Sequence, residues 1–293
     1  RKLFFIIFSI GFLLYAVIHI GENFRDVFIG FFVWIFNFFI GEYGQLNNGF
    51  DIVLFNFSNQ NQVIAVGPKY FSTILTTVFA ILFSFSISFL CNYFIIVKKN
   101  SMTAFLKNTL DWFSTIHIMI FSIIIHSIYQ NDISFLMGVI IISISSNAFY
   151  ELSSLQYSDM LSLNSKDFII AARAWGDKVS KHMKRTFMIN SINQLFSLWI
   201  IFFSNCMIYE MVFQKSGLGY LLWKYFLDST KSSVSSSMSY NEDYIGIQDS
   251  SLGLSVVQEP YIFLTISMLV VVTLCSINSM RVIALHYLIN YKR

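Results

Sequence analysis

Long apolar stretches separated by short polar ones run along most of this 293-residue chain. A bilayer core about 30 Å thick requires about 20 mostly apolar residues per helix. By that measure, the pattern predicts six membrane-spanning helices, over residues 3–20, 71–97, 110–128, 133–155, 195–213 and 261–285. We therefore expect an all-α polytopic membrane protein, because backbone groups inside lipid must be satisfied within the segment itself.

A further apolar segment, residues 27–40, is too short for a span between Asp26 and Glu42. Its length suits an interfacial or re-entrant helix on the outer side. We expect its aromatic residues Phe31, Trp34 and Phe38 to be anchors at the membrane interface. Residues 1–70 then hold the first span, this outer helix and a loop, and residues 71–293 hold the other five spans.

The basic residues are distributed unevenly about these six spans. Most of the 19 fall on one side, namely Arg1, Lys2, Lys98, Lys99, Lys107, Lys166, Arg173, Lys178, Lys181, Lys184, Arg185, Arg281, Lys292 and Arg293. The other side has Arg25, Lys69, Lys215, Lys224 and Lys231. Because cytoplasmic loops are enriched in Lys and Arg, we predict that both termini are cytoplasmic.

The composition supports a lipid environment. The chain is 56% hydrophobic and only 12% charged, whereas about a quarter of the residues of a soluble domain are charged. Cys91, Cys206 and Cys275 lie far apart in apolar segments, so we expect buried or lipid-facing thiols and no disulfide or metal site. Beyond one basic loop, nothing indicates nucleic-acid binding. Residues 228–258 are Ser-rich and acidic and read as a flexible outer loop.

The charged loop over residues 165–195 is the predicted contact surface for a soluble partner. Asp167 complements a helix dipole at its start, and Gly176 is a suitable helix stop, so a short surface helix is expected between them. Ala171, Ala172 and Ala174 leave a small-residue face around Arg173. Another protein could therefore approach this backbone closely.

From Lys178 onward the loop has a basic stripe at helical spacing, continued by Lys181, Lys184 and Arg185. We expect a second helix along the membrane surface before the fifth span. A competing explanation is that these side chains only reach anionic headgroups and fix the topology.

The residue order in this loop resembles that of a known family. Asp167-Phe-Ile-Ile-Ala-Ala-Arg-Ala-Trp-Gly176 is similar to D-Y-V-R-T-A-R-A-K-G, a form of the EAA loop of binding-protein-dependent ABC permeases of the oligopeptide, dipeptide and nickel class. Asn190 matches the Asn of the family's R-N-A-L-x-P stretch, although Gln194 replaces its Pro. Residues 210–222, EMVFQKSGLGYLL, resemble E-x-V-F-x-x-P-G-L-G-x-L-L, with Ser216 in place of Pro.

Weaker similarities extend along the chain. Residues 41–44, GEYG, resemble the family's G-D-L-G, and residues 257–261 resemble the segment that enters its last span. Trp175 replaces a common Lys, and the 228–258 stretch is longer than usual.

The resemblance implies a type I ABC importer permease fold in the bacterial inner membrane. It also implies a coupling helix that docks into an ATP-binding subunit, carried over onto Asp167, Ala171, Ala172, Arg173, Ala174, Gly176 and Asn190. Glu210, Phe213, Gly217 and Gly219 would contribute to a gate along the pathway. The implied partners are ATP-binding subunits, a second homologous permease and an extracytoplasmic solute-binding protein, and the implied cargo is a peptide or similar small solute.

The chain itself is not expected to be an enzyme. It contains no GxxxxGK[ST] phosphate-binding pattern, so ATP and Mg²⁺ would be bound by a partner chain. Two other classes remain open. A secondary transporter or channel would require inverted repeats or helices broken within the membrane, and residues 1–130 show no similarity to residues 131–293. A non-transporting assembly or membrane-anchor subunit is the third.

Overall fold

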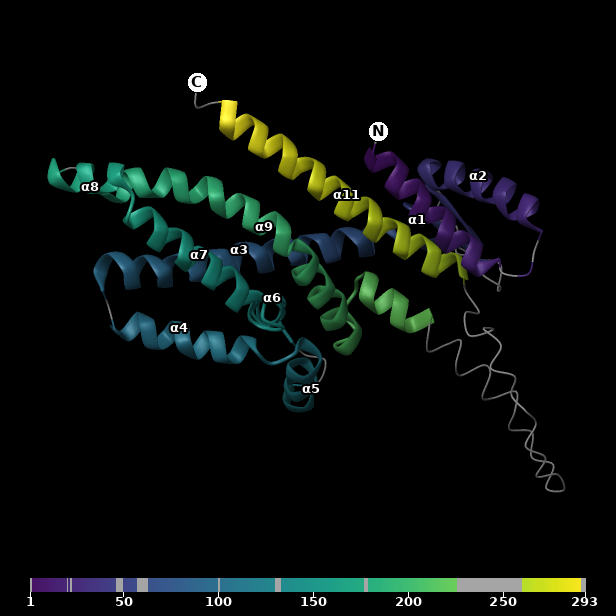
Figure 1. The fold of residues 1–293 in the computed structure, drawn as a ribbon. Coiled ribbons are helices and arrows are strands. Elements are labelled where there is room, and N and C mark those ends of the chain that lie inside the picture. The colour runs from purple at the N-terminus through teal and green to yellow at the C-terminus, as the bar shows by residue number, and fades with distance from the viewer. Residues whose placement is uncertain are drawn as a thin grey trace. The chain divides into compact units, whose positions relative to one another are not determined.

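Most described residues of the chain are helical (Figure 1). The computed structural model describes residues 2–19, 21, 23–45, 50–56, 63–99, 101–129, 133–176, 179–225 and 260–290. The chain divides into two units, of which the first comprises Arg1–Phe71 and Ser216–Cys275 and the second Ser72–Lys215 and Ser276–Arg293. The predicted outer loop at residues 228–258 lies outside the described residues.

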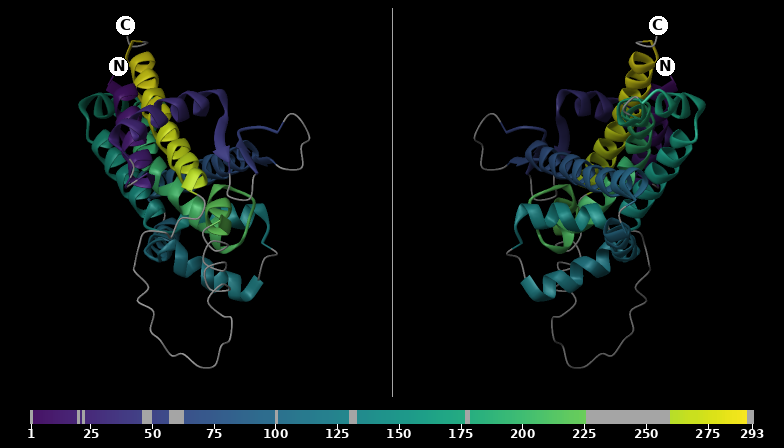
Figure 2. Two further views of the ribbon diagram at one scale, coloured as in Figure 1. Left: turned by 90° about the vertical axis from the view of Figure 1, so that its right-hand side faces the viewer. Right: turned by 90° about the vertical axis from the view of Figure 1, so that its left-hand side faces the viewer.

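In the first unit, α1 (Lys2–Ile18) and α2 (Phe24–Ile40) pack side by side (Figures 1 and 2). Their contact is aromatic, because the fully buried Phe31 ring meets the rings of Phe8 and Phe12 at 5.0 and 5.3 Å between centroids. α2 ends at Gly41, whose φ of 97° is in the left-handed region that favours glycine. The segment predicted at residues 27–40 is therefore a helix that begins three residues earlier.

The expected interface anchors Phe31, Trp34 and Phe38 are instead buried inside the first unit. Trp34 is 5% exposed, and its indole Nε1 donates a hydrogen bond to the carbonyl oxygen of Tyr43 at 3.3 Å. An apolar pattern does not distinguish a residue that faces lipid from one that faces a neighbouring helix, which explains the wrong prediction.

A small sheet follows α2 in a region that was expected to be a loop. Its strands are β1 (Glu42–Gln45), β2 (Asp51–Val53) and β3 (Val63–Ala65). β1 pairs with β2 antiparallel, and β2 pairs with β3 parallel. Strands of three or four residues are too short to produce a readable alternation of polar and apolar positions.

Three helices are long and apolar enough to cross a membrane: α3 (Gly67–Lys98), α9 (Val179–Val212) and α11 (Pro260–Asn290). The long apolar helices predicted at residues 71–97, 195–213 and 261–285 are therefore present as candidate spans. α9 is continuous from Val179, so the separate surface helix predicted before the fifth span is instead the first part of that same helix. α1 has only 17 residues, and its apolar part, Ile7–Ile18, is shorter than a span.

The third and fourth predicted spans are not straight helices. α4 (Ser101–Ser114) and α5 (Ile118–Tyr129) meet at a bend of 95°, and α6 (Phe135–Ile144) and α7 (Ala148–Asn164) meet at one of 61°. The described part of the chain thus holds three candidate spans, or five if each bent pair is counted as one.

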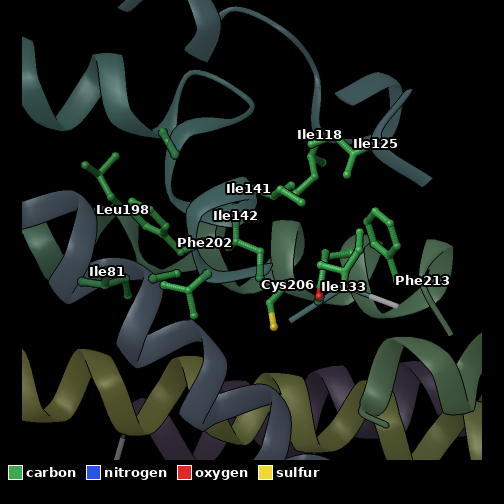
Figure 3. Packing of buried hydrophobic residues seen from close by; sticks show 14 of the residues in the cluster. Ile81, Ile118, Ile125, Ile133, Ile141, Ile142, Leu198, Phe202, Cys206 and Phe213 are labelled. Atoms are coloured by element: carbon green, nitrogen blue, oxygen red, sulfur yellow. The ribbon is translucent and has the colours of Figure 1, made fainter. Parts of the chain in front are cut away.

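An apolar core of the second unit lies where α5, α6, α7 and α9 meet. Ile118 of α5, Ile142 of α6 and Phe202 of α9 have no exposed surface and belong to this cluster (Figure 3). Cys206 is buried beside them as a free thiol, as expected for a cysteine in an apolar segment.

Candidate functional site

The predicted short surface helix is present as α8 (Asp167–Ala174), between α7 and α9. The backbone amides of Ile169 and Ile170 donate to the carbonyl oxygen of Lys166 at 2.9 and 3.1 Å, which closes the first turn. After the helix, Gly176 has a φ of +76°, and an added Cβ there would meet nothing within 4 Å. The glycine is thus required by its backbone conformation and not by a close neighbour.

One face of α8 packs against α7 and α9, and other positions of the helix are exposed. Ile169 is fully buried in a cluster with Met160, Leu163 and Phe187, which come from α7 and α9. Around this anchor, Asp167 and Ala174 are exposed, and Trp175 is 86% exposed. A force applied to the exposed side of α8 would therefore reach both neighbouring helices through the Ile169 cluster.

Several predicted residues of this loop have no described side chain. Ala172 and Arg173 lie in α8 and Lys181, Lys184 and Arg185 in α9, but their side chains are outside the described set, as is all of Lys178. Ala171 is half-buried. The predicted basic stripe is accordingly not assessed by the structure.

Asn190 is exposed on α9 and lines a cavity of about 300 Å³ together with Asp159, Asn193, Gln194 and Leu285. Gln194 Nε2 donates to the carboxylate of Asp159 on α7 at 2.7 Å. Arg281 Nε, on α11, donates to Asn193 Oδ1 at 2.6 Å. Gln194 therefore links α9 to α7.

Glu210 is a buried carboxylate near the end of α9, only 2% exposed. Thr73 Oγ1 donates to its Oε2 at 2.9 Å, and the Cys206 thiol donates to its Oε1 at 3.6 Å. Phe213 is also buried, with its ring 5.5 Å from that of His126.

The other two candidate gate residues, Gly217 and Gly219, are buried in the first unit, where residues 218–225 are helical. Glu210 and Phe213 thus belong to the second unit, and Gly217 and Gly219 belong to the first.

The two helix breaks form a site that the sequence reasoning missed. The backbone amide of Asn147 donates to the carbonyl oxygen of Ser114 at 2.6 Å, and that of Ser146 donates to the carbonyl of Ile116 at 3.0 Å. In the other direction, the amide of Ile118 donates to Ser146 Oγ at 2.9 Å. Each break thus satisfies polar groups that the other leaves open. The Ser-Ser-Asn run at residues 145–147, inside an apolar stretch, was the available signal.

The fold and these sites define a multi-pass helical membrane protein with several long apolar helices. Among the described residues, no group of three or more His, Cys, Asp or Glu side chains is placed to hold a metal ion. No protein-family model matches the chain, and no curated protein matches it either.

Proposed function

We propose that this chain is the membrane-spanning permease subunit of an ABC-type importer for peptides or a similar small solute. The carrying observation is α8, a short helix anchored through Ile169 and exposed at Asp167, Ala174 and Trp175. A coupling helix needs this combination, because it must contact a soluble ATPase and pass the motion of that ATPase to the membrane helices. The motif order over residues 165–222 adds to this argument.

In this function the chain forms half of a translocation pathway and hydrolyses no ATP. Closure of two ATP-binding subunits would move α8, and the Ile169 cluster would pass that movement to α7 and α9. The Asp159–Gln194 hydrogen bond gives a second connection between the same two helices. A motion of this kind drives transport only if the ATPase contacts differ between inward- and outward-facing states.

Site-directed cross-linking tests the proposal. In a background with the three native cysteines replaced, Trp175→Cys should form a cross-link to a co-purifying ATPase, and the yield should change when ATP is added. The matched control is Phe135→Cys, which is also exposed, at 52%, but begins α6 at the opposite end of the bent pair from the α8 segment. A cross-link from Phe135→Cys alone, or no ATPase at all, contradicts the proposal.

A secondary transporter or channel is a second candidate, favoured by the two bent helix pairs. Helices broken within the membrane are a feature of such proteins, since they free backbone groups to line a path. The discriminating measurement is reconstitution into liposomes without any ATPase. Solute or ion flux from the purified chain alone favours this class, whereas the permease proposal expects no flux until ATP-binding subunits and ATP are added.

A further inference from the structure

A cavity of about 710 Å³ in the first unit has no role in the proposed coupling. It lies between α1, α2, the small sheet and the start of α11, all in the same unit. Its lining includes Tyr15, Trp34, Glu42, Gln45, Asp51 and Tyr261. That volume is within the range of about 300–1,000 Å³ that is usual for small-molecule sites.

Two glycines allow aromatic side chains to line this cavity. A Cβ added to Gly30 on α2 would lie 2.6 Å from the hydroxyl oxygen of Tyr15. A Cβ added to Gly44 would lie 3.0 Å from the ring of Tyr261, and Gly44 also has a φ of +113°. Both rings thus occupy space that only glycine leaves open.

A bulge in β1 brings the polar lining residues to one face of the sheet. Glu42 pairs with Val53 and Gln45 pairs with Asp51, with a register shift between Glu42 and Gly44. Residues 42 and 45 would face opposite sides of a regular strand, but the extra residue in the bulge restores them to the same side. Asp51 and Val53 are two apart on β2 and also share a face, so both carboxylates are directed to one side.

The charge of the lining favours a cationic occupant. Glu42 and Asp51 carry negative charge, and none of the described lining residues is Lys or Arg. Gln45 Nε2 donates to Asp51 Oδ1 at 2.8 Å, which leaves the second carboxylate oxygen of Asp51 for another donor. The ring of Tyr261 adds to these groups, because aromatic faces attract ammonium ions. The ring of Tyr15 is instead stacked on that of His19, and the ring of Trp34 on that of Phe31.

We infer that this cavity binds a small molecule that carries ammonium groups. Because Glu42 pairs with a residue two positions from Asp51, the two acidic positions are separated by about 7 Å along the strand. That spacing suits a ligand with two amino groups on a short aliphatic chain.

Calorimetric titration of the purified full chain in a neutral detergent tests the inference, with 1,5-diaminopentane as the probe. Two molecules of the same length serve as controls, 1,5-pentanediol with neutral ends and glutarate with anionic ends. The diamine should bind saturably, and its affinity should fall as salt is added. Neither control should bind. Equal binding of the diol would overturn the inference, because hydroxyl recognition would then be sufficient.

Paired variants locate the binding. Glu42→Gln combined with Asp51→Asn should weaken diamine binding at least about tenfold, since each lost ion pair within a partly closed site contributes substantially. The control is Asp26→Asn, which removes a carboxylate from α2, a helix that lines the cavity, at a position outside the lining. This variant should leave the affinity within about twofold of the wild type. Unchanged binding in the double variant places the amine elsewhere and contradicts the assignment. No ATPase enters the measurement, so its outcome is separate from that of the proposed function.

Discussion

The backbone amide of Asn147 donates a hydrogen bond to the carbonyl oxygen of Ser114 over 2.6 Å, at the point where the two bent helix pairs meet. Unpaired backbone groups in an apolar environment cost several kcal/mol each. The two breaks therefore stabilise each other, and the conformation of each bend depends on hydrogen bonds to the other. Asn205 adds a contact from α9, with its side-chain amide donating to the carbonyl oxygen of Ser145 at 3.4 Å.

The conformation of Asn147 gives the first prediction. Its φ of 60° is left-handed, which asparagine tolerates and a β-branched residue does not. Asn147→Val should lower stability by about 1–3 kcal/mol, seen as a lower thermal unfolding midpoint in detergent. Asn147→Gly keeps the conformation accessible and should remain close to the wild type. Equal destabilisation by both substitutions would point to the Asn side chain instead.

Gly138 on α6 provides a second prediction, because an added Cβ would overlap the hydroxyl oxygen of the buried Tyr209. Gly→Ala inside a helix normally stabilises by about 0.5–1 kcal/mol. Here overpacking should outweigh that gain at about 1–3 kcal/mol, so Gly138→Ala should lower the unfolding midpoint.

The same substitution made in a Tyr209→Leu background removes the opposing ring. Gly138→Ala should then be neutral or stabilising relative to Tyr209→Leu alone. If it is as harmful as in the wild type, the contact with Tyr209 is not the cause.

The buried pair Thr73 and Glu210 leads to a third prediction. Thr73→Val preserves the shape but removes a hydroxyl that donates to the carboxylate at 2.9 Å. Losing a donor to a buried carboxyl group should cost about 1–3 kcal/mol, whereas Thr73→Ser should retain most of the stability. A double-mutant cycle with Glu210→Gln measures the coupling, and additive effects would show that the two residues act independently.

Gly176 gives a prediction that depends on the proposed function. Its left-handed φ is accessible to asparagine but not to proline. Gly176→Asn should retain ATP-driven uptake, and Gly176→Pro should abolish it while the amount of protein in the membrane stays the same. Because an added Cβ would meet nothing within 4 Å, a loss of uptake must come from the backbone turn. Normal uptake by Gly176→Pro would exclude α8 as the coupling helix.

Hydropathy was sufficient to predict the long straight helices, but not the bent pairs. α3, α9 and α11 are uninterrupted apolar helices, and length alone reveals them. The break between Ser114 and Ile118 lies in a segment with no Pro or Gly, and its conformation depends on Ser146 and Asn147, which are remote in sequence. A local pattern cannot reveal a break whose hydrogen bonds are tertiary.

The candidate sites divide in the same way. α8 was predictable because a helix start at Asp167 and a glycine with positive φ at Gly176 are local signals. The cavity of the first unit was not, because Tyr261 and Glu42 come together only through the packing of α11 against β1. The aromatic residues of α2 were misjudged since their environment depends on α1.

The paired breaks also constrain the order in which the protein enters the membrane. Synthesis delivers residues 101–129 to the bilayer before residues 133–164. Until the second pair arrives, the carbonyl oxygens of Ser114 and Ile116 have not yet met the amides that bind them in the folded chain. The first bent pair alone would therefore expose unpaired backbone carbonyl groups to lipid, which costs free energy. The two pairs are thus expected to leave the insertion machinery together, as a single four-helix intermediate.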